Sequence, residues 1–122
     1  MLCGVSAGSL CWFEEGITGF HGRPRRFEGL GFLPFSNAVH YDADQRRGDA
    51  YRQHLAEGMC PGYAACDGTA LHFTGERLHR AVSSRPGARA FRMGAHGGQV
   101  KKRPLVVDYL GALRAVTGAT AA

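Results

Sequence analysis

The pattern Gly4-Val-Ser-Ala-Gly8 constrains the fold of this chain more than any other feature of the sequence. A G-x-S-x-G pattern between an apolar strand and a helix marks a very sharp turn, in which the serine backbone is strained and its hydroxyl is exposed. Small flanking residues are needed because larger side chains would collide in such a turn. The apolar residues 1–5 therefore predict the end of a buried strand, and residues 7–15 predict a helix that stops at Gly16.

The rest of the chain divides into short elements separated by turn residues. Residues 16–28 are typical of a polar loop, residues 29–34 of a short buried strand ended by proline, and Asp44 of the cap of a helix that runs to Glu57. Residues 62–65, 70–73, 78–83 and 88–93 predict strands, because the turn dipeptides Asp67-Gly68, Thr74-Gly75 and Pro86-Gly87 separate them. Residues 94–98 predict another turn, and residues 104–113 a closing strand or a terminal helix.

Composition excludes several classes of protein. A length of 122 residues suits one domain, and 44% hydrophobic with 20% charged residues is typical of a globular chain rather than a disordered one. No apolar run approaches the roughly 18 residues of a membrane span, and the first residues do not form a secretory signal. The four cysteines lack zinc-binding spacing, so we expect reduced, mostly buried thiols in a cytoplasmic protein.

The formal net charge of +5 invites comparison with nucleic-acid-binding proteins. Much of the excess lies in the second half of the chain, where Arg89 and Arg92 are typical of the solvated face of a strand. No basic motif interleaved with aromatic residues accompanies it. We therefore expect no nucleic-acid partner and no membrane partner.

A serine nucleophile requires a base, and His40 is the best placed of the six histidines. It follows an apolar strand and its loop, which is where the catalytic groups of open α/β sheets gather. The interval from Ser6 to His40 is too short for the usual order of the α/β-hydrolase fold, in which the histidine lies far towards the C-terminus.

Several motifs in order resemble the C-terminal half of the peptidase E family, which comprises aspartyl dipeptidases and their cyanophycinase relatives. They are Gly4-Val-Ser-Ala-Gly-Ser9, Gly29-Leu-Gly-Phe-Leu-Pro34, His40-Tyr-Asp42, Arg46-Arg47, Gly62-Tyr-Ala64 and Asp67-Gly68. The resemblance covers about residues 2–93. It implies part of a three-layer α/β sandwich of the class I glutamine amidotransferase-like (flavodoxin-like) type, without its N-terminal βα units and with short strands in its C-terminal half. Residues 94–122 would add a terminal strand or helix and a tail.

The resemblance also implies a mechanism. Ser6 would be the nucleophile, His40 the general base, and the backbone N–H of Ala7 one half of the oxyanion hole. The family hydrolyses short peptides with an N-terminal aspartate and uses no metal or other cofactor. A glutamine amidotransferase of this fold would carry cysteine at the position of Ser6, so that chemistry is disfavoured.

The third catalytic residue is less well defined. The loop that often supplies an acidic residue reads Thr18-Gly-Phe-His21 here, so Glu14 becomes the predicted partner of the His40 imidazole, with Glu15 and Asp42 as alternatives. The familiar Asp-Asp-Gly of the family appears as Cys66-Asp-Gly68, which indicates the loss of a polar contact.

The chain begins at the expected strand that leads into the turn of Ser6. The resemblance therefore implies that the preceding βα units, which supply the second oxyanion donor, are missing. We expect a fragment, or a chain completed by a homodimer partner or by a separate missing half. Besides a peptidase, two other functions stay open, namely a catalytically silent remnant or binding module of the same fold, and a small basic nucleic-acid binder.

Overall fold

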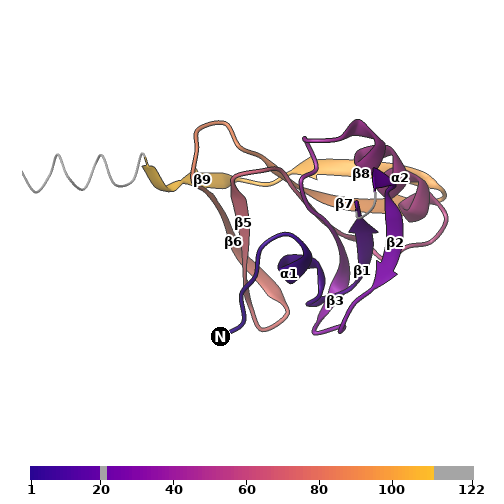
Figure 1. Cartoon of the computed structure of the whole chain (residues 1–122), viewed down its shortest axis with the longest axis horizontal. Helices are drawn as coiled ribbons and strands as arrows, with labels where there is room; N and C mark the ends of the chain where they lie inside the picture. Colours follow the sequence, from indigo (N-terminus) through magenta and orange to yellow (C-terminus); the bar gives the residue numbers. More distant parts are fainter. Residues whose placement is uncertain (20–21, 112–122) are drawn as a thin grey trace, which may run out of the picture.

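The computed structural model describes residues 1–19 and 22–111, which form two β-sheets and two helices within these ranges (Figure 1). In chain order the elements are α1 (Ala7–Leu10), β1 (Phe13–Thr18), β2 (Arg25–Glu28), β3 (Leu33–Ala38), α2 (Gln45–Ala56), β4 (Gly62–Ala65), β5 (Thr69–Thr74), β6 (Arg77–Ser83), β7 (Ala90–His96), β8 (Gln99–Pro104) and β9 (Val107–Tyr109). The larger sheet has the order β2-β1-β3-β4-β7-β8, and the smaller sheet has the order β5-β6-β9. This arrangement confirms the expected α/β class.

The centre of the larger sheet is parallel, and its outer strands are antiparallel. Strand β3 pairs in parallel with both β1 and β4, whereas β2, β7 and β8 pair antiparallel with their neighbours. Helix α2 covers one face, where Tyr51 and Leu55 pack into a buried cluster with Ile17, Phe91 and Met93. The carboxyl ends of β3 and β4 consequently lie side by side at one edge, as in other open parallel sheets.

The opposite face of the larger sheet is covered by α1 and by the smaller sheet (Figure 1). The ring of Phe73 on β5 lies 5.8 Å from that of Phe13, 6.1 Å from that of Phe35 and 5.4 Å from that of Tyr63, measured between ring centroids. Aromatic pairs at these separations stabilise packing beyond the area that they bury. This aromatic cluster therefore joins the two sheets.

Two predictions for the first third of the chain are wrong. The helix expected over residues 7–15 ends at Leu10, and the expected loop over residues 16–28 contains the end of β1 and the whole of β2. A short apolar run is compatible with either a helix or a buried strand, and here pairing with β3 decides the outcome. The strand expected over residues 29–34 is also misplaced, because β3 runs from Leu33 to Ala38, so that residues 29–32 precede it and Pro34 lies near its start rather than at its end.

The predicted strand over residues 1–5 is also absent. No described strand pairs with this segment, and Met1, Leu2 and Val5 are exposed rather than buried. Of the four free cysteines only Cys66 is buried, so the expectation of mostly buried thiols is wrong as well. Among the described residues, no helix is both long and apolar enough to cross a bilayer.

The predictions that depend on local signals are confirmed. The Asp44 carboxylate accepts a hydrogen bond of 2.9 Å from the backbone N–H of Arg46 and so caps α2. The expected turn glycines, Gly68, Gly75 and Gly87, all have positive φ. By contrast, the turn expected over residues 94–98 is wrong for its first three residues, because β7 continues to His96 and only Gly97 and Gly98 form the turn. The closing strand is present as β9, whereas residues 112 and 113 lie outside the described part.

Candidate active site

Ser6 lies at the turn between the N-terminal segment and α1. Its φ of 57° and ψ of −118° place a non-glycine residue in a sparsely populated region of backbone conformation. A Cβ atom on Gly4 would collide with the carbonyl group of Gly8, whereas one on Gly8 would meet open space. The sharp turn is therefore present as predicted, but only Gly4 is required by sterics.

His40 follows the end of β3 and lies against Ser6. The Oγ atom of Ser6 is 3.0 Å from the Nε2 atom of His40. His40 also has a positive φ, of 51°, and the backbone N–H of the next residue, Tyr41, donates to the carbonyl oxygen of Ala65 at the end of β4. These contacts fix the strained turn that brings the imidazole to Ser6.

Asp67 follows the end of the neighbouring strand β4 and contacts the other side of the His40 ring. Its carboxylate is hydrogen-bonded to the Nδ1 atom of His40. An ionised carboxylate only accepts hydrogen bonds, so Nδ1 carries the proton and Nε2 is left to accept from the Ser6 hydroxyl. The site thus contains a serine, a histidine and an aspartate linked in series.

Two further residues hold Asp67 in place. The Asp42 carboxylate accepts a hydrogen bond of 2.9 Å from the backbone N–H of Asp67. The guanidinium of Arg85 donates to the backbone carbonyl of Asp67 at 2.9 Å and lies 3.9 Å from Asp42. Asp42, the sequence alternative for the partner of the His40 imidazole, thus contacts the backbone of Asp67 and the guanidinium of Arg85.

Glu14 does not reach His40. It is exposed on β1, whereas its neighbour Glu15 is buried. Glu15 forms an ion pair with Arg26 and accepts a hydrogen bond from the backbone N–H of Cys60. The carboxylate that contacts His40 is thus Asp67 rather than the predicted Glu14.

A sequence signal for Asp67 exists. It is a short polar residue directly after a buried strand, and that strand is the parallel neighbour of the one that ends before His40. From the sequence, Asp67-Gly68 is interpreted as a turn dipeptide and as part of a family motif, and neither interpretation assigns Asp67 to His40. The turn is real, since Gly68 has a φ of 86°.

The buried residue Asn37 was also missed. Its side-chain amide donates to the carbonyl oxygen of Tyr63 at 2.9 Å, and its oxygen accepts from the Ser9 hydroxyl at 3.2 Å. A polar side chain this buried is retained when its hydrogen bonds are satisfied. Asn37 therefore attaches α1, and with it Ser6, to the sheet.

The surroundings of the site are open to solvent on this chain. The side chains of His40 and Asp67 are 40% and 42% exposed. Ala7 is exposed, and its backbone N–H forms no hydrogen bond with any residue that the structure describes. This N–H is free to donate to an oxyanion formed on a carbonyl attacked by Ser6.

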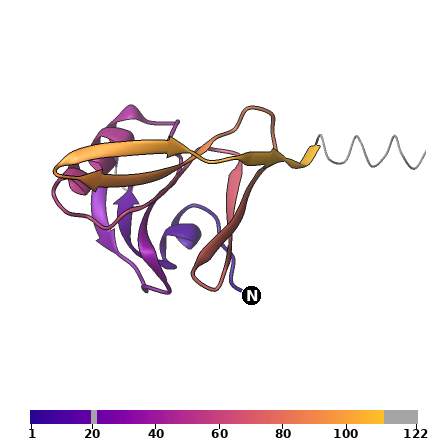
Figure 2. The ribbon, with the colours of Figure 1, turned by 180° about the vertical axis from the view of Figure 1, so that it is seen from behind.

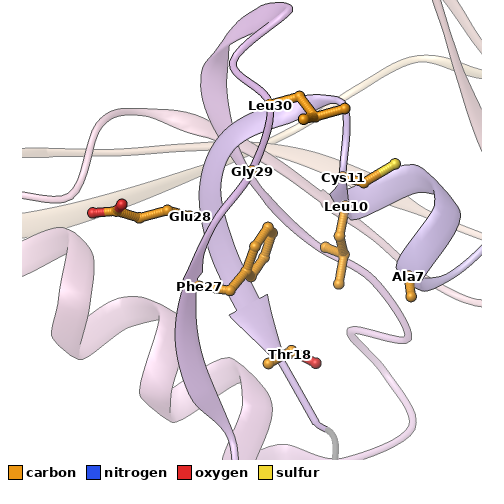
Figure 3. A pocket seen from close by; sticks show the side chains of 8 residues that line it. All are labelled: Ala7, Leu10, Cys11, Thr18, Phe27, Glu28, Gly29 and Leu30. Atoms are coloured by element: carbon orange, nitrogen blue, oxygen red, sulfur yellow. The ribbon is translucent and has the colours of Figure 1, made fainter.

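An apolar hollow of about 350 Å³ lies beside the turn, between α1 and β2 (Figure 3). Ala7 lies at one end of it, and Leu10 and Phe27 face one another across it.

In the described ranges no three histidine, cysteine, aspartate or glutamate side chains are arranged to hold a metal ion. Burial raises the pKa of the Cys66 thiol next to Asp67, so this thiol stays neutral.

Comparison with known proteins decides the family. The sequence model of Peptidase family S51 matches residues 1–81. This chain belongs to peptidase family S51. It is also 45% identical over 112 residues to the "Uncharacterized peptidase YgaJ" of Bacillus subtilis (strain 168), a match that covers 91% of this chain and 49% of the relative. No solved structure gives a significant match.

The S51 assignment confirms the resemblance to peptidase E, and the α/β structure fits part of an S51 fold. The chain spans about half the length of the curated relative that it matches.

Proposed function

We propose that this chain carries the catalytic serine of an S51 peptidase that hydrolyses short peptides. Ser6 acts as the nucleophile, His40 as the general base and Asp67 as the residue that orients the imidazole. The observation that carries the proposal is the continuous series of contacts from Ser6 Oγ, through both nitrogens of His40, to the Asp67 carboxylate. Serine peptidases on unrelated folds are recognised by this arrangement rather than by sequence position.

The steps follow from the positions of the protons. Nε2 of His40 takes the hydroxyl proton of Ser6 while Oγ bonds to the scissile carbonyl carbon, and the carbonyl oxygen becomes an oxyanion. The exposed N–H of Ala7 donates to this oxyanion. The imidazolium, stabilised by Asp67, then gives its proton to the leaving amine, so that the C–N bond breaks and an acyl-enzyme remains. Water deprotonated by His40 releases the acid and restores Ser6.

The substrate class rests on the resemblance to peptidase E. Peptides with an N-terminal aspartate are therefore the first substrates to test. The mechanism described needs only side chains, a backbone N–H and water, and no cofactor is proposed.

We further propose that full activity needs a second polypeptide segment. In this chain Ala7 provides one oxyanion donor, whereas the resemblance to peptidase E places the second on βα units that precede the nucleophile. This second segment would be the half of an S51 domain that precedes the nucleophile. A second copy of this chain is the alternative, and a molar-mass measurement in solution distinguishes a homodimer from a monomer.

The proposal is tested by covalent labelling and by hydrolysis. The purified chain is incubated with a fluorophosphonate and, separately, with aspartyl-p-nitroanilide. We expect phosphonate attached to Ser6, abolished by Ser6→Ala and retained in Ser84→Ala, whose exposed hydroxyl donates to the carbonyl oxygen of Gly68 rather than to His40. A folded chain that is labelled nowhere and hydrolyses nothing, alone or joined to the preceding half of an S51 domain, would favour the catalytically silent alternative.

A further inference from the structure

The hairpin of β7 and β8 forms one edge of the larger sheet and runs across the molecule in Figure 2. Cross-strand partners in an antiparallel pair point to the same face. Arg92 is paired with Arg103, and Gly94 with Lys101, so these three basic side chains lie on one face. The remaining lysine, Lys102, is paired with Met93 and points to the other face, where it lies over the rings of Phe91 and Tyr41.

A cavity of about 330 Å³ opens on the face that carries the three cations. Its lining includes Arg92, Lys101 and Arg103, together with His96 and Pro61, and contains no carboxylate. Cavities of this size accept small organic molecules. A concave surface lined by charges of one sign raises the local concentration of the opposite ion.

The charges of this cavity are not neutralised by the protein. The guanidinium of Arg92 lies over the rings of Tyr63 and Phe35, at 4.9 and 5.2 Å, and its buried Nη1 has no hydrogen-bond partner among the described residues. Within the same part of the chain, Lys101 and Arg103 form no ion pair, whereas four other arginines do, namely Arg26, Arg46, Arg80 and Arg85. The three cations repel one another, and an anion bound among them would relieve that repulsion.

The cavity is separate from the candidate active site. Pro61, in its lining, precedes β4, whereas Asp67 follows the other end of that strand. A ligand bound at the cavity therefore lies at the opposite edge of the sheet from His40. Binding at this cavity is therefore independent of the peptidase function proposed for Ser6.

We propose that this cavity binds a small anion with two or more phosphate or carboxylate groups. Arg103 presents a planar fork suited to either group, and Lys101 adds a mobile point charge. The Arg92 guanidinium is stacked on the rings of Tyr63 and Phe35 and contributes mainly through its positive potential. More than one anionic group is needed because the three cations are spread along the hairpin.

The experiment is a calorimetric titration of the purified chain at low ionic strength with inorganic pyrophosphate and, in a second series, with citrate. The variant Lys101→Gln/Arg103→Gln removes two charges from the cavity. The control Lys102→Gln/Arg77→Gln removes two charges elsewhere and leaves the same net charge. Thermal melting of both variants establishes that each is folded, and added salt should weaken binding of the unaltered chain.

We expect at least one anion to bind and the cavity variant to weaken that binding by about tenfold or more, since hydrogen bonds to charged groups are lost. The control should change it less than about threefold, because neither Lys102 nor Arg77 lines the cavity. Tighter binding of pyrophosphate identifies a phosphate site, and tighter binding of citrate a carboxylate site. Absence of binding at millimolar anion, or equal weakening in both variants, would overturn the proposal.

Discussion

At the scale of single residues, the orientation of His40 depends on a carboxylate that is itself held by its neighbours. Asp67 contacts Nδ1, while Asp42 and Arg85 fix the backbone of Asp67. This arrangement selects one imidazole tautomer, which is the one able to accept the proton of Ser6.

Replacing Asp67 by asparagine should therefore slow the reaction of Ser6. An asparagine amide can donate to Nδ1, which moves the ring proton to Nε2 and removes the base from the Ser6 hydroxyl. We expect fluorophosphonate labelling of Asp67→Asn to slow by about 100-fold or more, with little loss of stability. The control is Glu14→Gln, which should label at the normal rate. Equal slowing in both variants would show that the carboxylate contact does not orient His40.

Gly4 and Gly8 both belong to the G-x-S-x-G pattern, but only Gly4 is required by sterics. Alanine at Gly4 forces a Cβ against the carbonyl group of Gly8, whereas alanine at Gly8 meets open space. Overpacking of this kind costs about 1–3 kcal/mol. Urea denaturation should show this loss for Gly4→Ala, together with slower labelling of Ser6, and less than about 0.5 kcal/mol for Gly8→Ala. A larger loss for Gly8→Ala would mean that the turn is organised differently.

At the scale of elements, Glu15 connects three segments of the larger sheet. Its side chain on β1 pairs with Arg26 on β2 at 2.6 Å and accepts from the N–H of Cys60, just before β4. Burial alone would raise the pKa of Glu15, but the hydrogen bonds from Cys60 and Arg26 outweigh it and hold the pKa below its ordinary value of 4.5. Burial and the nearby Glu15 charge together raise the pKa of the Cys60 thiol to about 12, so this thiol stays neutral.

The stability of the chain should depend on pH through Glu15. Because the pKa in the folded state is lowered, the ionised carboxylate stabilises the fold above pH 4.5 and this contribution is lost as the pH falls through the lowered pKa. Glu15→Gln should lower the free energy of unfolding by about 1–3 kcal/mol at pH 7. The difference from the unaltered chain should shrink below pH 4.5. A difference that is independent of pH, or equally present in Glu14→Gln, would contradict this role.

Elements encoded by neighbouring residues were predictable, and those that depend on distant partners were not. The cap of α2 at Asp44 and the turns at Gly75 and Gly87 follow from residue type alone. Residues 13–15 of β1 are predicted as the end of a helix and residues 16–18 as part of a loop, and only pairing with β3 makes this segment a strand. In the same way, Ser6 and His40 are predicted as site residues from their residue types and their positions in the sequence. Asp67 is recognised as a partner of His40 only once β3 and β4 are known to be parallel neighbours.

At the scale of the whole molecule, apolar surface gathers around the segment that carries Ser6. Leu2 and Val5 on the N-terminal segment are exposed, as are Leu30 and Phe32 in the loop before β3. Both segments adjoin α1, because the backbone N–H of Gly8 donates to the carbonyl oxygen of Val5, and that of Leu30 donates to the carbonyl oxygen of Cys11, just after α1. The apolar hollow of Figure 3 lies beside the same helix. Exposed apolar patches of this kind mark surfaces that pack against another polypeptide.

We expect this surface to be covered when the chain is joined to the half of YgaJ that lies outside the match, placed ahead of Met1. Covering apolar side chains stabilises the fold by roughly 25 cal/mol for each Å² removed from water, so the melting temperature should rise. Binding of an apolar fluorescent dye should fall, and labelling of Ser6 should accelerate as the second oxyanion donor arrives.

An unrelated domain fused at the same point is the control, and it should change neither dye binding nor labelling. If the two fusions behave alike, the apolar surface around α1 does not receive the other half of an S51 domain. If dye binding falls but labelling does not accelerate, the two halves associate without completing the oxyanion site, and the activity of Ser6 is limited instead by the contacts of His40 and Asp67. The two measurements therefore distinguish the contribution of the other half of an S51 domain to packing from its contribution to the reaction of Ser6.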